Sequence, residues 1–239
     1  MKQYIVIIIL ALFMVACGQH SMHWGTLAQV ESFMEERPDS ALTILQGIDT
    51  TQLHSSEDKA LYGLLYTQAK DKNYIDTSDD LKISSAVDYY KNSDDQYHKM
   101  LSYYYLARIQ FNNKEYSNSI TNLLRAESEA IDLEDNFQLG LIYRLFGDIH
   151  AQIYNGVESL NYSQKSYEHF KKSGREEYSD WALWDIARAY HNCKDFEASI
   201  RTAKEMIEQG RLRHNETLIT AGLKLIGLSY FASGQFEKS

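Results

Sequence analysis

Large and small apolar positions recur with a fixed spacing along the second half of the chain. In each of four segments a large side chain is followed three residues later by a second large one, and then at once by alanine or glycine. These small residues are 40 positions apart: Ala107, Gly147, Ala187 and Gly227. A constant register over four copies indicates an internal structural repeat.

A second feature follows each small residue in the same register. Twelve residues later the chain has a serine, and three residues before that serine it has an aromatic residue or a glycine. The serines are Ser119, Ser159, Ser199 and Ser239, preceded by Tyr116, Gly156, Phe196 and Phe236. Small side chains at such positions let one antiparallel helix approach the next, while the large ones fill the gaps. The pattern therefore predicts pairs of packed helices.

This pattern resembles the tetratricopeptide repeat (TPR), and Gly227-x-x-Tyr230 followed by Gly234-x-Phe236 matches it best. The resemblance implies an all-α fold, a right-handed superhelical solenoid of antiparallel helix pairs. The chain departs from the usual TPR in its period, 40 residues against about 34, and no proline closes its repeats. The longer period implies helices that are about one turn longer, or longer loops.

Six helix pairs can be assigned from residue 24 onward. The first has Pro38 near the start of its second helix, and Ser56 and Ser78 are the expected N-caps of the second pair. The predicted pairs span residues 24-48, 56-91, 95-131, 136-172, 177-210 and 216-239. The last pair is incomplete, because Ser239 stands where its second helix should begin. Since a solenoid normally ends in a polar capping helix, we expect the chain to be the N-terminal part of a longer protein.

Residues 1-16 have the pattern of a secretion signal. Lys2 is followed by an apolar run that ends at Ala16 and would be about 20 Å long as a helix, short of the ~30 Å hydrocarbon core of a membrane. Met14-Val15-Ala16-Cys17 resembles the bacterial lipobox, in which the cysteine is acylated; the alternative is an ordinary signal peptide with a chance cysteine. We expect a lipid on Cys17, a linker over residues 17-23, and attachment to the bacterial cell envelope. By resemblance to bacterial lipoproteins, we expect this attachment at the outer membrane. The sequence does not specify which face of that membrane.

Charge and motif content narrow the functions of the chain. A net charge of −9 disfavours a nucleic-acid partner, and with Cys17 acylated only Cys193 remains, so no internal disulfide can form. Gly-rich phosphate loops, an HExxH motif and cysteine-rich metal spacings are absent. Ser56-x-x-Lys59 lacks the companion motifs of penicillin-binding enzymes and is better explained as a helix N-terminus. We therefore expect no catalytic activity, cofactor or metal site.

In TPR proteins the first helix of each pair lines a concave groove that holds a partner. Counted from the register, the resemblance places there Tyr104, Arg108, Phe111, Arg144, Asp148, Trp181, Trp184, Arg188, His191, Lys224 and Phe231. We expect this surface to bind an extended peptide or acidic segment, with aromatic anchors and with arginines that bind carboxylates. The alternative is that the aromatic residues pack between repeats.

Two functions are compatible with these features. The first is a non-catalytic protein-protein interaction scaffold, anchored by lipid in the cell envelope, that binds a peptide or protein in its groove. The alternative is the sensory or interaction half of a larger TPR signalling or transcription-regulating protein that continues past residue 239, which the incomplete sixth pair favours. A catalytic domain past residue 239 would be a third class, but nothing in the chain points to it.

Overall fold

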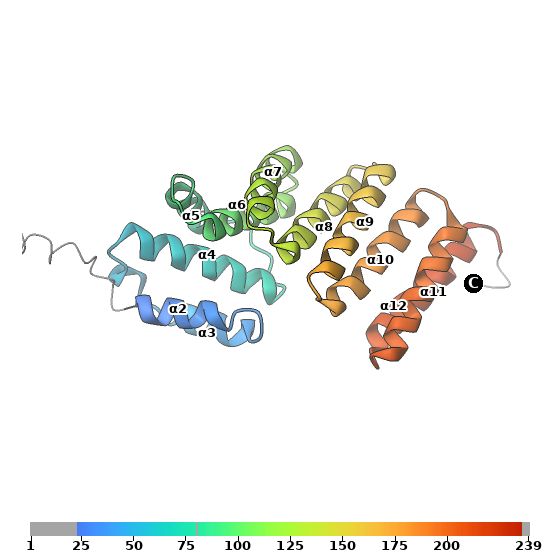
Figure 1. Cartoon of the computed structure of the whole chain (residues 1–239), viewed down its shortest axis with the longest axis horizontal. Coiled ribbons are helices and arrows are strands. Elements are labelled where there is room, and N and C mark those ends of the chain that lie inside the picture. The colour runs from blue at the N-terminus through green and yellow to red at the C-terminus, as the bar shows by residue number, and fades with distance from the viewer. Residues whose placement is uncertain (1–22, 80, 236–239) are drawn as a thin grey trace, which may run out of the picture. The chain divides into compact units, whose positions relative to one another are not determined.

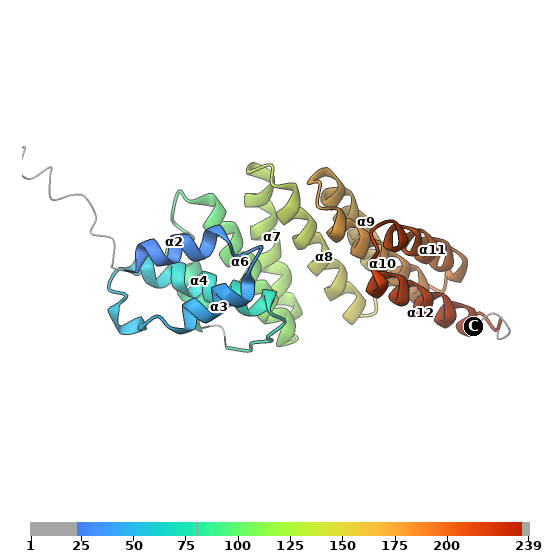
Figure 2. The same ribbon diagram turned by 90° about the horizontal axis from the view of Figure 1, so that it is seen from below.

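The computed structural model of the chain describes residues 23–79 and 81–235. Within these ranges the secondary structure is helical throughout, with eleven α-helices, one short 3₁₀ helix and no strand. Consecutive helices pack against one another in antiparallel pairs (Figures 1 and 2). The predicted all-α class with TPR-like helix pairs is confirmed. The chain forms two compact units, residues 1–92 and 93–239.

The first unit has a core built from its first three α-helices. Leu27, Leu45 and Leu65, one from each of these helices, are fully buried together. Pro38 is the first residue of its helix, where the missing N–H has no intrahelical partner to lose. The helices are α2 (Trp24–Ser32), α3 (Pro38–Gln46), α4 (Ser56–Lys72) and α5 (Leu81–Tyr90), with the 3₁₀ helix at Thr50–Gln52.

Two helix starts in the first unit differ from the sequence prediction. The N-cap of α4 is Ser55 and not Ser56, because the Ser55 hydroxyl accepts a hydrogen bond of 3.0 Å from the Asp58 N–H. Helix α5 begins at Leu81, three residues after Ser78. Both differences concern adjacent polar residues of similar capping ability, which a sequence pattern ranks poorly.

The described part of the second unit, up to residue 235, has seven helices of equal length, each of 17 residues. They are α6 (Gln96–Asn112), α7 (Tyr116–Asp132), α8 (Asn136–Gln152), α9 (Gly156–Lys172), α10 (Glu176–Asn192), α11 (Phe196–Leu212) and α12 (Glu216–Ala232). Each begins at the same interval after the one before it, so the repeat period divides into two equal halves. In Figure 1 the helices from α8 to α12 lie side by side as a row of alternating direction.

The turns between these helices have one backbone conformation, which explains why they need no proline. One residue in each turn has a positive φ, always at the same place in the turn: Lys114, Glu134, Tyr154, Gly174, Lys194, His214 and Gly234. The next residue donates its N–H to a carbonyl five positions back, as in the 2.8 Å bond from Glu115 to Gln110. This is the Schellman motif, which satisfies the last carbonyls of a helix and ends it.

The same turns also start the following helix. In five of the seven helices an aspartate or asparagine caps the first turn, because its side chain accepts a hydrogen bond from the N–H three residues on. These caps are Asp95, Asp135, Asn155, Asp195 and Asn215. Three-residue turns thus end each helix from α6 to α11 and lead directly into the next helix, which four of these turns also cap.

Small residues lie where the two helices of a pair come closest. Ala107 in α6 is fully buried, and the Ser119 hydroxyl of α7 donates a hydrogen bond of 2.8 Å to its carbonyl oxygen. At Gly147 in α8 an added Cβ would lie 3.2 Å from Oγ of Ser163 in α9. The structure therefore has the close contacts that the small residues predict. None of the helices in the described ranges has both the length and the apolar character required to cross a membrane.

Gly63 in α4 allows a close approach that can be tested. A Cβ at this position would lie 2.4 Å from the carbonyl oxygen of Lys82 in α5, so Gly63→Ala would have to push the helices apart. We expect a loss of about 1 to 3 kcal/mol in the free energy of unfolding, although alanine favours a helix by ~1 kcal/mol over glycine. Gly25→Ala in α2, where nothing lies within 4 Å of the added atom, is the control and should not destabilise. Urea unfolding measures the free energy of unfolding of both variants. Equal changes in Gly63→Ala and Gly25→Ala would contradict the close contact at Gly63.

Candidate functional site

A groove of about 820 Å³ lies in the second unit, on the first helices of three successive pairs. Helix α8 contributes one residue to its lining, and the others come from α10 and α12. Its lining consists of Arg144, Trp181, Trp184, Arg188, His191, Asn192, Glu216, Thr217, Thr220, Ala221, Lys224, Leu225 and Leu228. The groove thus combines two indoles and several aliphatic side chains with three cationic ones.

Six of the residues selected from the sequence line this groove together. They are Arg144, Trp181, Trp184, Arg188, His191 and Lys224. Both tryptophans are half-buried, because they also pack against the core residues Leu183, Met206 and Leu218. The same rings thus pack between helices and also form part of the wall of the groove.

The other selected residues lie elsewhere. Tyr104 is buried edge-on against Tyr105. The guanidinium of Arg108 lies 5.9 Å from the centre of the Phe111 ring on the same helix. Phe231 is exposed on α12 and does not line the groove. Asp148 is not among the lining residues and is paired with Arg188. Cys17 lies outside the described residues.

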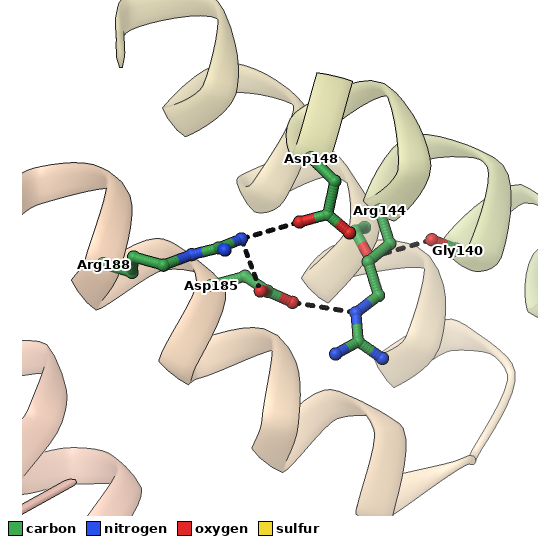
Figure 3. Close-up of polar contacts among 6 residues, drawn as sticks. Gly140, Arg144, Asp148, Asp185 and Arg188 are labelled. Carbon is green, nitrogen blue, oxygen red and sulfur yellow. Dashed lines mark hydrogen bonds and ion pairs between the residues drawn. The ribbon is translucent and has the colours of Figure 1, made fainter. Parts of the chain in front are cut away.

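Four charged residues form a network between α8 and α10 (Figure 3), and two of them, Arg144 and Arg188, also line the groove. Arg144 donates from Nε to Oδ2 of Asp185 at 3.0 Å. Arg188 donates from one terminal nitrogen to Oδ1 of Asp185 at 3.1 Å and to Oδ1 of Asp148 at 2.7 Å. Asp185 is therefore the centre of the network, and both of its oxygens are occupied.

Asp185 is the site residue that the sequence pattern missed. It is buried, and the equivalent positions in the other first helices hold buried apolar side chains: Tyr105, Leu145 and Leu225. The signal in the sequence was an aspartate at a repeat position that otherwise holds core residues. Carboxylates are almost never fully buried unless they are paired. Position 185 is not among the predicted groove positions, although Leu225, its equivalent in α12, lines the groove.

Burial controls the protonation of this network. Loss of water around Asp185 raises its pKa from 3.8 to about 6; the nearby cations, Arg144 first, oppose this shift, and the charge of Asp148 adds to it. Burial alone would lower the pKa of Arg144, but the negative charges of Asp185 and Asp148 outweigh it and raise that pKa. Above its pKa of about 6, Asp185 is ionised and lies between the two arginines.

Two further contacts hold the side chains of the groove in place. The guanidinium of Arg188 lies 4.6 Å from the centre of the Trp184 ring, within cation–π range. Nδ1 of His191 is 3.0 Å from the hydroxyl of Ser229 in α12. A wall whose rotamers are already fixed loses little conformational entropy when a ligand binds.

Besides the two indoles, the polar side chains that line the groove in the described part of the chain are three cations, one carboxylate, one imidazole, one amide and two threonine hydroxyls. The groove contains no serine or cysteine among its described lining residues, and no group of three or more His, Cys, Asp or Glu within residues 23–79 and 81–235 could hold a metal ion. A second cavity of about 360 Å³ lies near Asp180, whose carboxylate is paired with Arg213. Since these charges neutralise each other, the larger groove is the better candidate for a ligand site.

Comparison with known proteins supports the fold and leaves the function open. No protein-family model matches the chain, and no curated protein matches its sequence. The crystal structure of aspartyl phosphate phosphatase F from Bacillus subtilis is similar, with a TM-score of 0.58 and 14% identity over 92% of this chain. The chain covers 62% of the length of that protein. At this identity the likeness shows a TPR-like helical repeat fold.

The burial of Asp185 makes the stability of the fold depend on pH. Because its pKa rises from 3.8 to about 6 on folding, the folded state holds more protons than the unfolded state between these values, and the free energy of unfolding falls as the pH rises through them. One unit of pKa corresponds to about 1.4 kcal/mol. From about pH 4 to pH 7 the free energy of unfolding of the wild type should therefore fall by up to about 3 kcal/mol more than that of Asp185→Asn. Urea unfolding of both proteins across this range measures the change, and a constant difference would rule it out.

Proposed function

We propose that the chain is a non-catalytic scaffold that binds a peptide or a protein segment in the groove on α8, α10 and α12. The observation that carries this proposal is the pair of half-buried tryptophans in the groove wall, next to cationic side chains. Tryptophan and arginine are the residues that most often dominate binding energy at protein interfaces. A cleft of this volume, open along the helices, accommodates several residues of an extended chain.

The surroundings of the groove support a binding role in a second way. Its cationic residues stand out in a chain with a net charge of −9, so the groove offers local attraction to a partner that the rest of the surface repels. The repeat fold supplies rigid helices on both sides, which hold the contact residues in fixed positions.

Peptide selection tests this function. The purified chain is presented with a library of acetylated and amidated seven-residue peptides, and the bound sequences are identified and made individually. Trp184→Ala should weaken their binding by about 30-fold or more, because truncating an interface tryptophan typically removes at least ~2 kcal/mol. Isothermal titration calorimetry gives the dissociation constants.

A matched variant separates the groove from general surface adhesion. Tyr154 lies in a turn outside the groove and is 96% exposed, so Tyr154→Gly removes an aromatic side chain without altering the groove. Binding should be the same as in the wild type. Selected peptides that bind Trp184→Ala and wild type alike would overturn the groove as the functional site.

We also propose that acylation of Cys17 holds the scaffold at the bacterial cell envelope, at the outer membrane. The support is the sequence around Met14-Val15-Ala16-Cys17, with Lys2 and an apolar run before it. More than one acyl chain on a single cysteine would give durable attachment, since one chain alone binds membranes only marginally.

Labelling of cells with palmitate tests the anchor. Cys17→Ala should lose the label and the protein should leave the membrane fraction. The chain contains two cysteines, so Cys193→Ala, which changes an exposed turn residue of the second unit, is the control and should keep the label. Equal labelling of the two variants would eliminate Cys17 as the acylation site.

A further inference from the structure

Asp185 breaks the pattern that the rest of the second unit follows. Its side chain is 4% exposed at a position where three other first helices place apolar core residues. Burying an ion pair usually stabilises a fold no more than well-packed apolar residues of similar volume would. An apolar residue would therefore serve the packing at least as well, and such local departures are expected where a protein has a functional task.

The contacts of Asp185 show which task it can perform. It holds Arg144 through Nε only, at 3.0 Å. The two terminal nitrogens of Arg144 make no hydrogen bond with any of the described residues, and Figure 3 shows them directed away from Asp185. Because Arg144 also lines the groove, with 36% of its side chain exposed, this end of the guanidinium is available to a ligand.

The groove around Arg144 favours an anionic ligand with an apolar neighbour. The planar end of a guanidinium presents two parallel donors that match the two oxygens of a carboxylate. Lys224 in α12 adds a second cation that has no hydrogen bond or ion pair within the described part of the chain. Among the described residues that line the groove, Glu216 alone is acidic, whereas Arg188 is already bound by two carboxylates.

We propose that the groove recognises a peptide carboxylate, which Arg144 binds through its terminal nitrogens, and that Asp185 is a positioning residue that holds Arg144 in this orientation. An apolar side chain of the peptide next to the carboxylate packs on Trp181 and Trp184. This inference rests on the proposed function and specifies its ligand. We assign this carboxylate to an aspartate or glutamate side chain of the peptide; a free C-terminal carboxylate has the same chemistry and is an alternative outcome of the test.

Matched peptides test the ligand class. From the library of acetylated and amidated peptides, the tightest binders should contain aspartate or glutamate beside an apolar residue. Replacing that acid by its amide should weaken binding to the wild type by about tenfold to 100-fold, the range typical of a charge-assisted hydrogen-bonded pair. The amide peptide with a free C-terminal carboxylate is measured as well, and recovery of the lost affinity there assigns the site to a peptide terminus.

Variants of the chain test the two arginine contacts separately. In Arg144→Gln the acid and amide peptides should bind within about threefold of each other, because the fork that distinguishes them is gone. Asp185→Asn should reduce the discrimination at least fivefold from the wild-type ratio while leaving the affinity for the amide peptide within threefold, a result that mere loss of folding would not give. Arg201→Gln, an exposed arginine of α11 outside the groove, should retain the wild-type discrimination.

A second substitution keeps the test decisive if Asp185→Asn does not fold. Asp185→Leu restores the apolar character of the other repeats and still removes the partner of Arg144. Circular dichroism checks the fold of each variant, and both substitutions should reduce the discrimination.

The outcomes separate this inference from the proposed function. Peptides that lose affinity with Trp184→Ala, but do not distinguish acid from amide, overturn the carboxylate site and leave the peptide groove. Full discrimination in Asp185→Asn and Asp185→Leu overturns the positioning role. Peptides that are insensitive to Trp184→Ala overturn the groove itself and this inference with it.

Discussion

The second unit depends on one constraint, which is that each helix and its turn together always occupy the same length of chain. Equal helices joined by equal turns bring the same sequence separations into contact throughout the unit. Residues 12 apart meet across a pair, as in the bond between Ser119 and the Ala107 carbonyl. Residues 40 or 41 apart meet between successive first helices, as in Asp148 with Arg188 and Arg144 with Asp185. The charged network is thus a product of the repeat length.

The network also shows how one position of a repeat can depart from its equivalents. Most positions of a solenoid are fixed by nearest-neighbour packing, so their residue types are set by size and apolar character. Asp185 replaces an apolar side chain with a buried carboxylate whose pKa is raised, chiefly by burial, to about 6. In return it fixes the direction of two arginines from adjacent helices. Stability and orientation of the groove are therefore coupled through one residue.

Much of the fold could be predicted from the sequence because its cause is local and repeated. Small residues in constant register, such as Ala107 and Gly147, mark where the helices of a pair pack closely, and the large residues beside them indicate which faces are buried. The division of the period into two equal halves was not evident, because first and second helices carry different side chains and share only their turns. Those turns depend on a positive φ at residues as different as Lys114 and Tyr154, which composition does not reveal.

The candidate site could be predicted only in part. The register placed six residues on one groove, since groove-facing positions repeat as the core positions do. It could not show that Tyr104 is buried against Tyr105, because both tyrosines are compatible with either face. Nor could it give the partners of Asp185, since these lie on different helices and their pairing depends on side-chain directions that only the folded chain determines.

The uniform turns have a consequence for how such a chain can change over time. Because every turn joins the same two helix ends in the same conformation, a gain or loss of one whole helix pair between equivalent positions leaves each remaining junction intact. The pair of helices is therefore a unit that gene duplication can add or remove without rebuilding its neighbours. The charged network joins α8 and α10, which belong to two successive pairs, so it survives such events only where these two pairs stay adjacent.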